Sequence, residues 1–229
     1  MNADRPILIS IVGGSGAGKT WLSHRIAAAF PTEATEVSLD DFYLDRSGVR
    51  PDQRRLVNYD EPEAIEWGLL REFLEEFRRG RPGHVPRYDF SSHCRNGQRA
   101  ECTPTQLLIV EGLWLLTQPD VRELFDLSIY LECPAPVRLE RRLARDVVER
   151  GRQAADVRET FETVVAPMHI RHVAPQRRWA TVVMHDPVSE ADLEGAVSRV
   201  SRLLHGEGGK DERLVPAGGL QSADWRSAA

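Results

Sequence analysis

A glycine-rich segment directly follows the first apolar run of this 229-residue chain. The run at 7–12 has the length and composition of a buried strand, and a helical pattern begins at Trp21. Between them, residues 13–20 read GGSGAGKT, which fits the pattern G-x-x-x-x-G-K-[ST] without a mismatch. A strand, a glycine-rich loop and a helix in this order form the context that the motif requires, and they indicate an α/β fold.

The motif predicts a loop that binds phosphate (a P-loop), made by Gly13, Gly14, Ser15, Gly16, Ala17, Gly18, Lys19 and Thr20. Its glycines let successive backbone N–H groups turn toward an anion, and the next helix adds the positive end of its dipole. Lys19 supplies a mobile charge for the β- and γ-phosphates, and the Thr20 hydroxyl can bind Mg²⁺. A turn that only joins strand and helix is the alternative. The lysine argues against it, because 28 of the 30 basic residues are arginine.

Short apolar runs alternate with helical patterns along the chain. The apolar runs lie at 7–12, 36–39, 107–110, 127–131 and 181–184, and the helical patterns at 21–30, 63–79, 137–150 and 189–204. This alternation predicts an α/β fold of the P-loop NTPase type: a parallel sheet of about five strands with helices on both faces.

Residues 81–104 lack helical periodicity. Two extended stretches there flank Asn96 and Gly97, a dipeptide favoured in tight hairpin turns, which predicts a small inserted β-hairpin. We expect a single domain over 1–205, with the hairpin at 81–104 and an Arg-rich helix and lid at 138–165. Glycine pairs and scattered charges predict a flexible C-terminal tail over 206–229.

Overall charge and hydropathy exclude several classes of partner. Thirty basic against 35 acidic residues give a formal net charge of −5, which argues against a general attraction to nucleic acid or an anionic membrane. No apolar stretch approaches the roughly 18 residues needed to span a bilayer. Three cysteines make no disulfide framework. We expect a soluble cytoplasmic protein with small-molecule partners; the sequence leaves a homo-oligomer open.

Two acidic residues follow predicted strands. Glu111 comes directly after the run at 107–110, and Asp40 comes directly after the run at 36–39. Ligands bind at this edge of open α/β sheets, so Glu111 is predicted to hold Mg²⁺ or position a water, and Asp40 to act as general base for an attacking hydroxyl. An acid solvated at a strand end, or a cap formed by Asp40 and Asp41, is the alternative. No N-K-x-D motif occurs, which argues against a guanine-reading GTPase.

Arginines cluster on the predicted helix at 137–150. Those at helical spacing are Arg138, Arg141, Arg142 and Arg145, and Arg150 and Arg152 follow. Such a face is suited to clamp triphosphate oxygens and to stabilise a transferring phosphoryl group. The alternative is a solvated helix face paired with its own acids, here Glu140, Asp146 and Glu149.

Taken in order, these motifs resemble the uridine/cytidine kinase family, within the phosphoribulokinase/uridine kinase group of P-loop kinases. The matching stretches are 13–20, 40–43, 58–64, 86–95, 111–113 and 138–152. Only the P-loop is specific by itself, but six motifs in the same order and spacing are specific together.

The resemblance implies a kinase that uses ATP or GTP with Mg²⁺ and phosphorylates the 5′-hydroxyl of uridine or cytidine. It makes Asp40 the base, with Lys19 and Arg145 as further catalytic residues and Arg150 beside the nucleotide phosphates. It places the hairpin at 81–104 in the acceptor pocket. The implied substrate contacts are Asp60, Tyr43, Tyr59, Tyr88, Phe90, His93, Arg142 and Arg152, and the implied metal site is Thr20 with Glu111.

The sequence leaves the identity of the phosphate acceptor the most open. A neutral His93 can donate or accept a hydrogen bond, so it would tolerate uracil and cytosine alike; a zinc site with His84, Cys94 and Cys102 does not have the usual ligand spacing. Thr160 stands where the family has a glutamine that contacts the sugar.

Two other functions compete with the nucleoside kinase. One is a phosphoribulokinase- or pantothenate kinase-like enzyme with a different acceptor. A phosphorylated acceptor would need extra cations, for which the candidates are Arg50, Arg54, Arg55 and Arg95. The other is a non-catalytic NTP-binding regulator, which would have no need of a base beside the loop.

Overall fold

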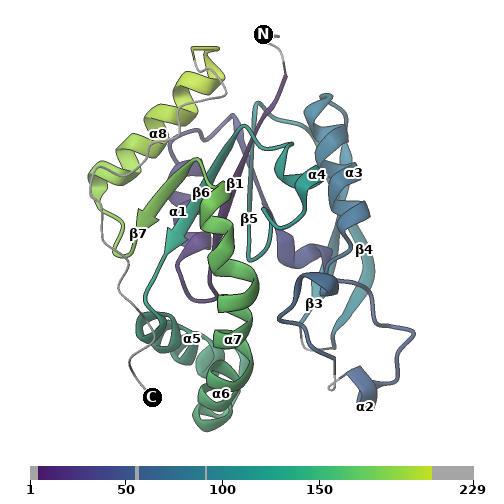
Figure 1. Ribbon diagram of the computed structural model, residues 1–229. Coiled ribbons are helices and arrows are strands. Elements are labelled where there is room, and N and C mark those ends of the chain that lie inside the picture. The colour runs from purple at the N-terminus through teal and green to yellow at the C-terminus, as the bar shows by residue number, and fades with distance from the viewer. Residues whose placement is uncertain (1–4, 55–56, 91, 208–229) are drawn as a thin grey trace.

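The computed structural model describes residues 5–54, 57–90 and 92–207 (Figure 1). Its strands are β1 (Ile7–Gly13), β2 (Ala34–Ser38), β3 (Gly83–Asp89), β4 (Cys94–Cys102), β5 (Leu107–Gly112), β6 (Leu127–Glu132) and β7 (Val182–His185). Its α-helices are α1 (Lys19–Ala27), α2 (Pro51–Arg54), α3 (Trp67–Arg78), α4 (Pro119–Arg122), α5 (Ala135–Arg150), α6 (Ala154–Thr160), α7 (Ala166–Met168) and α8 (Glu190–Leu204). Most of the predicted tail 206–229 lies outside the described residues.

A parallel sheet of five strands in the order β2-β5-β1-β6-β7 forms the centre of the molecule. All seven residues of β1 are buried, as expected for a central strand covered on both faces. Leu8 and Val12 pack on the side of α3, whereas Ile9 and Ile11 pack on the side of α1 and α8. The predicted α/β fold with helices on both faces is confirmed. Within the described ranges, no helix combines the length and apolarity of a bilayer span.

The carboxyl ends of the parallel strands meet at one edge of the sheet, where α5, α6 and α7 gather on one side and the β3–β4 hairpin on the other (Figure 1). The glycine-rich loop leaves β1 at this edge and enters α1. Gly16 and Gly18 have φ of 81° and 95°, which favours glycine at both positions. A Cβ on Gly16 would also lie 2.5 Å from the backbone oxygen of Arg138, so the first turn of α5 packs directly on the loop.

The hairpin is present, but the predicted position of its turn is wrong. The chain reverses between Asp89 and Cys94, where the backbone N–H of His93 donates to the Asp89 oxygen at 2.9 Å. Asn96 and Gly97 lie inside β4, in an irregular stretch where residues 96–98 face Arg87 alone. Gly97, with φ of 76°, therefore lets the backbone of β4 bulge at this point and does not form the hairpin turn.

The helix predicted at 63–79 begins four residues later than expected. Residues Pro62–Ala64 form a 3₁₀ turn, and Ile65 pairs with Tyr43 in an isolated β-bridge. The N–H of Glu66 donates to the Phe42 oxygen at 2.9 Å, so tertiary pairing takes the hydrogen bonds that a first helical turn would use. The predicted helices at 137–150 and 189–204 are present, as α5 and α8.

Residues 154–179 form a nearly continuous helical run that the sequence did not predict. It includes α6, α7, the π-helical turns Phe161–Val165 and His169–Val173, and a 3₁₀ segment. Prolines and β-branched residues hide the helical pattern in this stretch. The predicted lid at 138–165 comprises α5, α6 and the first of these π turns.

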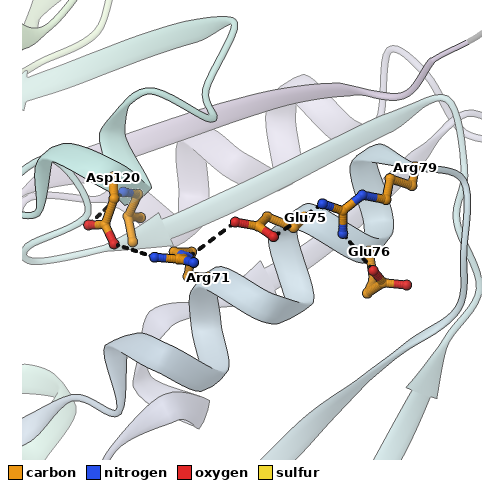
Figure 2. Close-up of polar contacts among 6 residues, drawn as sticks. Arg71, Glu75, Glu76, Arg79 and Asp120 are labelled. Carbon is orange, nitrogen blue, oxygen red and sulfur yellow. Dashed lines mark hydrogen bonds and ion pairs between the residues drawn. The ribbon is translucent and has the colours of Figure 1, made fainter.

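Some surface arginines only stabilise the exposed side of α3 (Figure 2). Arg71 pairs with Glu75 at 3.1 Å and with Asp120 of α4 at 3.2 Å, and Arg79 pairs with Glu75 and Glu76. These pairs are solvated, so each contributes little.

Candidate active site

Two adjoining cavities open at the carboxyl edge of the sheet. The smaller, of about 240 Å³, is lined by the glycine-rich loop, Glu111 and arginines of α5. The larger, of about 630 Å³, lies between the hairpin, residues 57–60 and the helical run. Residues that line both are Ser15, Asp40, Leu113, Arg142 and Arg145. A group bound in one cavity would thus meet a group bound in the other at this shared wall.

The first two residues of α1, Lys19 and Thr20, line the smaller cavity. Lys19 Nζ donates to the Gly14 oxygen at 3.3 Å, and Thr20 Oγ1 donates to Glu111 Oε1 at 3.3 Å. Ser38 also donates to Glu111 Oε1, at 3.0 Å. A hydroxyl and a carboxylate thus lie side by side, the hard oxygen donors that Mg²⁺ prefers. In the described residues no three His, Cys, Asp or Glu side chains are grouped for a metal ion, so water and bound phosphates would supply the remaining Mg²⁺ ligands.

The two neighbouring acids after β2 have different surroundings. Asp40 lines both cavities, and its backbone N–H donates to Ser38 Oγ at 3.2 Å, which fixes the start of the 3₁₀ turn Leu39–Phe42. Asp41 lines neither cavity and lies 4.0 Å from Arg87; burial raises the pKa of its carboxyl. The structure thus distinguishes the two acids: Asp40, the residue chosen from the sequence, lines both cavities, and Asp41 lines neither.

Aromatic rings cover the hairpin side of the larger cavity. Tyr43 stacks on Tyr88 with ring centroids 5.0 Å apart, and Phe90 lies edge-on to both. Tyr59 stacks on His93 at 4.1 Å with the rings 11° from parallel. The five aromatic residues among the predicted substrate contacts therefore line the same cavity.

His93 is held at the hairpin turn with φ of 56°, and its Nδ1 lies 3.3 Å from the Tyr88 hydroxyl. Burial, with Arg152 nearby, lowers the pKa of this imidazole, so the ring is neutral at pH 7. Burial raises the pKa of the Tyr88 phenol. Both groups therefore offer neutral hydrogen-bonding atoms to a ligand.

A buried charge cluster forms the opposite wall. Arg142 is 7% exposed and donates from NH1 to Ser15 Oγ at 3.0 Å. Burial raises the pKa of the Asp60 carboxyl, while Arg142 and Arg152 act in the opposite direction. Asp146, with no exposed surface, lies within 2.8 Å of Arg145 Nε, 3.4 Å of Arg142 Nε and 3.5 Å of Arg152 NH1.

Asp146 thus forms ion pairs with all three of these arginines. The interpretation of it as the partner on a solvated helix face is wrong, because its carboxylate is buried. The only sign of this pairing in the sequence is the spacing of four residues between Arg142 and Asp146, which places both on one face of a helix.

Several predicted residues lie elsewhere. Arg50 pairs with Asp52 at the surface, and Arg95 pairs with Glu66 at 2.6 Å. Arg54 donates to the carbonyl oxygens of residues 47, 49 and 92. The structure does not describe Arg55 or the side chain of Arg150. Thr160 lines the larger cavity, together with six residues to which the sequence assigned no role: Val57, Asn58, Leu113, Thr163, Val164 and Met168.

Comparisons with known proteins identify the family of this chain. A family model described as the phosphoribulokinase/uridine kinase family matches residues 8–193. The uridine kinase of Halobacterium salinarum is 39% identical over 176 residues, 77% of this chain and 78% of its own. The uridine kinase of Streptococcus gordonii is 36% identical over 203 residues, 88% of this chain and 97% of its own.

Solved structures share the fold. A putative fructose transport system kinase from Silicibacter sp. TM1040 has a TM-score of 0.64 at 23% identity, covering 79% of this chain and 90% of that chain. Phosphoribulokinase from Rhodobacter spheroides has a TM-score of 0.59 at 18% identity, covering 80% of this chain and 71% of that chain. At these identities the likeness supports the fold alone.

Proposed function

The chain belongs to the phosphoribulokinase/uridine kinase family, and we propose that it is a nucleoside kinase that transfers the γ-phosphate of ATP or GTP to the 5′-hydroxyl of uridine or cytidine. The observation that carries the proposal is the shared wall of the two cavities, where Asp40 faces both. The smaller cavity then takes the triphosphate and the larger takes the nucleoside. The reacting oxygen and the γ-phosphorus would meet beside Asp40.

Asp40 takes the proton of the attacking hydroxyl in this proposal. The 5′-oxygen forms a bond to the γ-phosphorus as the bond from that phosphorus to the β-γ bridging oxygen breaks, and the nucleoside diphosphate leaves. Lys19, Arg142 and Arg145 supply positive charge around the transferring group. Because phosphoryl transfer needs little covalent help from the protein, alignment and charge account for most of the rate.

Thr20 and Glu111 would hold Mg²⁺, together with oxygens of the bound phosphates. Their hydroxyl and carboxylate fit this ion, and the hydrogen bond of 3.3 Å between them supports a shared position for it. When bound, Mg²⁺ neutralises charge on the β- and γ-phosphates.

The pyrimidine would lie among the aromatic rings of the larger cavity. Its volume of about 630 Å³ is in the usual range for small-molecule sites. Tyr88 and His93 offer hydrogen bonds to the base, and a neutral His93 can present either a donor or an acceptor. Asp60 would bind ribose hydroxyls; burial raises the pKa of its carboxyl, and Arg142 and Arg152 act in the opposite direction.

The arginine contacts disfavour a phosphorylated acceptor. Arg50 and Arg95 are neutralised by acids, and Arg54 is engaged by carbonyl oxygens. None of the three lines the larger cavity. The partners in this proposal are the nucleoside and the NTP, and the place of action is the cytoplasm, where both are found.

Neighbouring acids provide a matched test of the catalytic assignment. Asp40→Asn removes the base and should lower kcat for uridine by about 100-fold or more, while ATP still binds. Asp41→Asn makes the same change one residue away, at a side chain outside both cavities, and should keep kcat within about threefold of wild type. Unimpaired turnover by Asp40→Asn would remove Asp40 from the base role.

A further inference from the structure

A histidine outside the proposed substrate contacts packs against Gly14 of the glycine-rich loop. His169 begins the π-helical turn His169–Val173. Its Nδ1 atom is buried and, among the described residues, has no hydrogen-bond partner. A Cβ built on Gly14 would lie 2.8 Å from this Nδ1 and 2.7 Å from Arg138 NH1. His169 and Arg138 therefore press on the loop at a residue that has no side chain.

Gly14 connects this contact to the reacting groups. Its carbonyl oxygen receives the hydrogen bond from Lys19 Nζ at 3.3 Å. A shift of the Gly14 peptide would therefore move both a backbone group of the phosphate site and the hydrogen-bond partner of Lys19.

His169 also belongs to the helical run 154–179, which lines the larger cavity. Thr160, Thr163 and Met168 of this run line the larger cavity. A small cavity of about 10 Å³ is bounded by His169 together with Ser15 and Asp60. His169 thus touches the phosphate loop while sitting on the same segment as the acceptor wall.

The surroundings of His169 keep its ring neutral. Burial, followed by the neighbouring charges of Arg138 and Lys19, lowers the pKa of the imidazole to about 4. Asp60, the acid on the same small cavity, faces it from the acceptor side. Around pH 7 the ring therefore adds no positive charge beside the loop.

We propose that His169 is a positioning residue for phosphoryl transfer: the ring edge that carries Nδ1 and the side chain of Arg138 pack on Gly14 and fix its backbone, and thereby the place of Lys19. This inference rests on the proposed function, because it takes the loop to bind the transferred phosphate. Misplacement of a reacting group by about 1 Å can cost on the order of 100-fold in rate, so a small loop shift is enough to be measured.

Three variants test whether the flat ring edge at Nδ1 is what holds Gly14. His169→Leu fills much of the space but has no ring nitrogens. His169→Asn keeps a polar atom near the place of Nδ1. The control, His172→Leu, makes the same change in the same turn at a residue that lines none of the three cavities. Initial rates with uridine and MgATP give kcat and both KM values, and far-UV circular dichroism checks the fold.

We expect His169→Leu to lower kcat about tenfold or more, with both KM values within about threefold of wild type. His169→Asn should recover most of the lost rate, and His172→Leu should match wild type. If His169→Leu does not fold, His169→Ala replaces it: a folded His169→Ala with kcat about tenfold or more below that of His169→Asn supports the proposal, and equal kcat in the two overturns it.

Wild-type kcat in folded His169→Leu, or equal loss in folded His169→Leu and His169→Asn, would overturn it. The acceptor-independent rate of ATP hydrolysis, measured on the same variants, distinguishes this failure from failure of the proposed function. A wild type that phosphorylates no pyrimidine nucleoside refutes the nucleoside kinase, whereas the hydrolysis rates of the variants still decide the role of His169.

Discussion

Replacing Asp146 by asparagine removes the negative charge shared by three arginines at the junction of the two cavities. The carboxylate has no exposed surface, and its oxygens lie 2.8 to 3.5 Å from guanidinium nitrogens of Arg142, Arg145 and Arg152. The side chain of Arg142 is 7% exposed, whereas those of Arg145 and Arg152 are 35% and 39% exposed. The three pairs therefore differ in how strongly water screens them.

Breaking a buried ion pair by removing one partner costs about 3–5 kcal/mol, and this applies to the pair with Arg142. The two partly solvated pairs add at most about 1 kcal/mol each. Asparagine keeps an oxygen that can accept a hydrogen bond from a guanidinium, so we take the low end, a loss of about 3 kcal/mol in the free energy of unfolding. For a chain of this size that lowers Tm by roughly 6–12 °C. Because Arg142 and Arg145 line both cavities, kcat should also fall about tenfold.

Thermal unfolding followed by circular dichroism, together with initial rates below the new Tm, checks both numbers. Asp52→Asn is the control, since it breaks an Arg–Asp pair whose side chains are 75% and 63% exposed. Its Tm should stay within about 2 °C of wild type. If Asp146→Asn matches this control in Tm and retains wild-type kcat, the argument that one buried carboxylate organises the arginines is refuted.

Three further predictions concern the loop, the base contact and the metal. Gly14→Ala should weaken ATP binding about tenfold or more in a titration, because its Cβ meets two side-chain nitrogens under 3 Å away, whereas Gly48→Ala, with no atom within 4 Å, should bind as wild type. Burial and Arg152 lower the pKa of His93, so the ring takes up a proton at a lower pH than an ordinary histidine. The KM for uridine should therefore stay constant between pH 8 and the ordinary histidine pKa of about 6.5 and rise only below it. A rise already at higher pH would contradict this. Glu111→Gln should raise the Mg²⁺ concentration for half-maximal rate about tenfold, and an unchanged value would remove Glu111 from the metal site.

Local patterns account for what the sequence predicted well. The order of strand, glycine-rich loop and helix depends on neighbouring residues, and it predicted the junction of β1 and α1 within a few residues. Apolar runs predicted the five parallel strands, because a central sheet is buried on both faces. The ends of those strands also predicted that Asp40 and Glu111 would lie near the loop.

Features set by contacts between distant segments were not predictable in this way. Asn96 and Gly97 have turn propensity, but the pairing of β3 with β4 places the reversal earlier. The start of α3 is delayed because Ile65 pairs with Tyr43. Nothing in the sequence around His169 distinguishes a surface histidine from one that packs on Gly14, since that contact joins residues 155 positions apart.

The central claim is that the larger cavity accepts a pyrimidine nucleoside, and a panel of acceptors tests it most directly. Transfer of label from γ-³²P-ATP would be measured with uridine, cytidine, ribulose 5-phosphate and pantothenate under the same conditions, with Asp40→Asn as the blank. The proposed function predicts labelled 5′-monophosphate from uridine, cytidine or both, at a kcat/KM far above that for the other two compounds. No transfer to either nucleoside, or preferred transfer to the sugar phosphate or pantothenate, would contradict it.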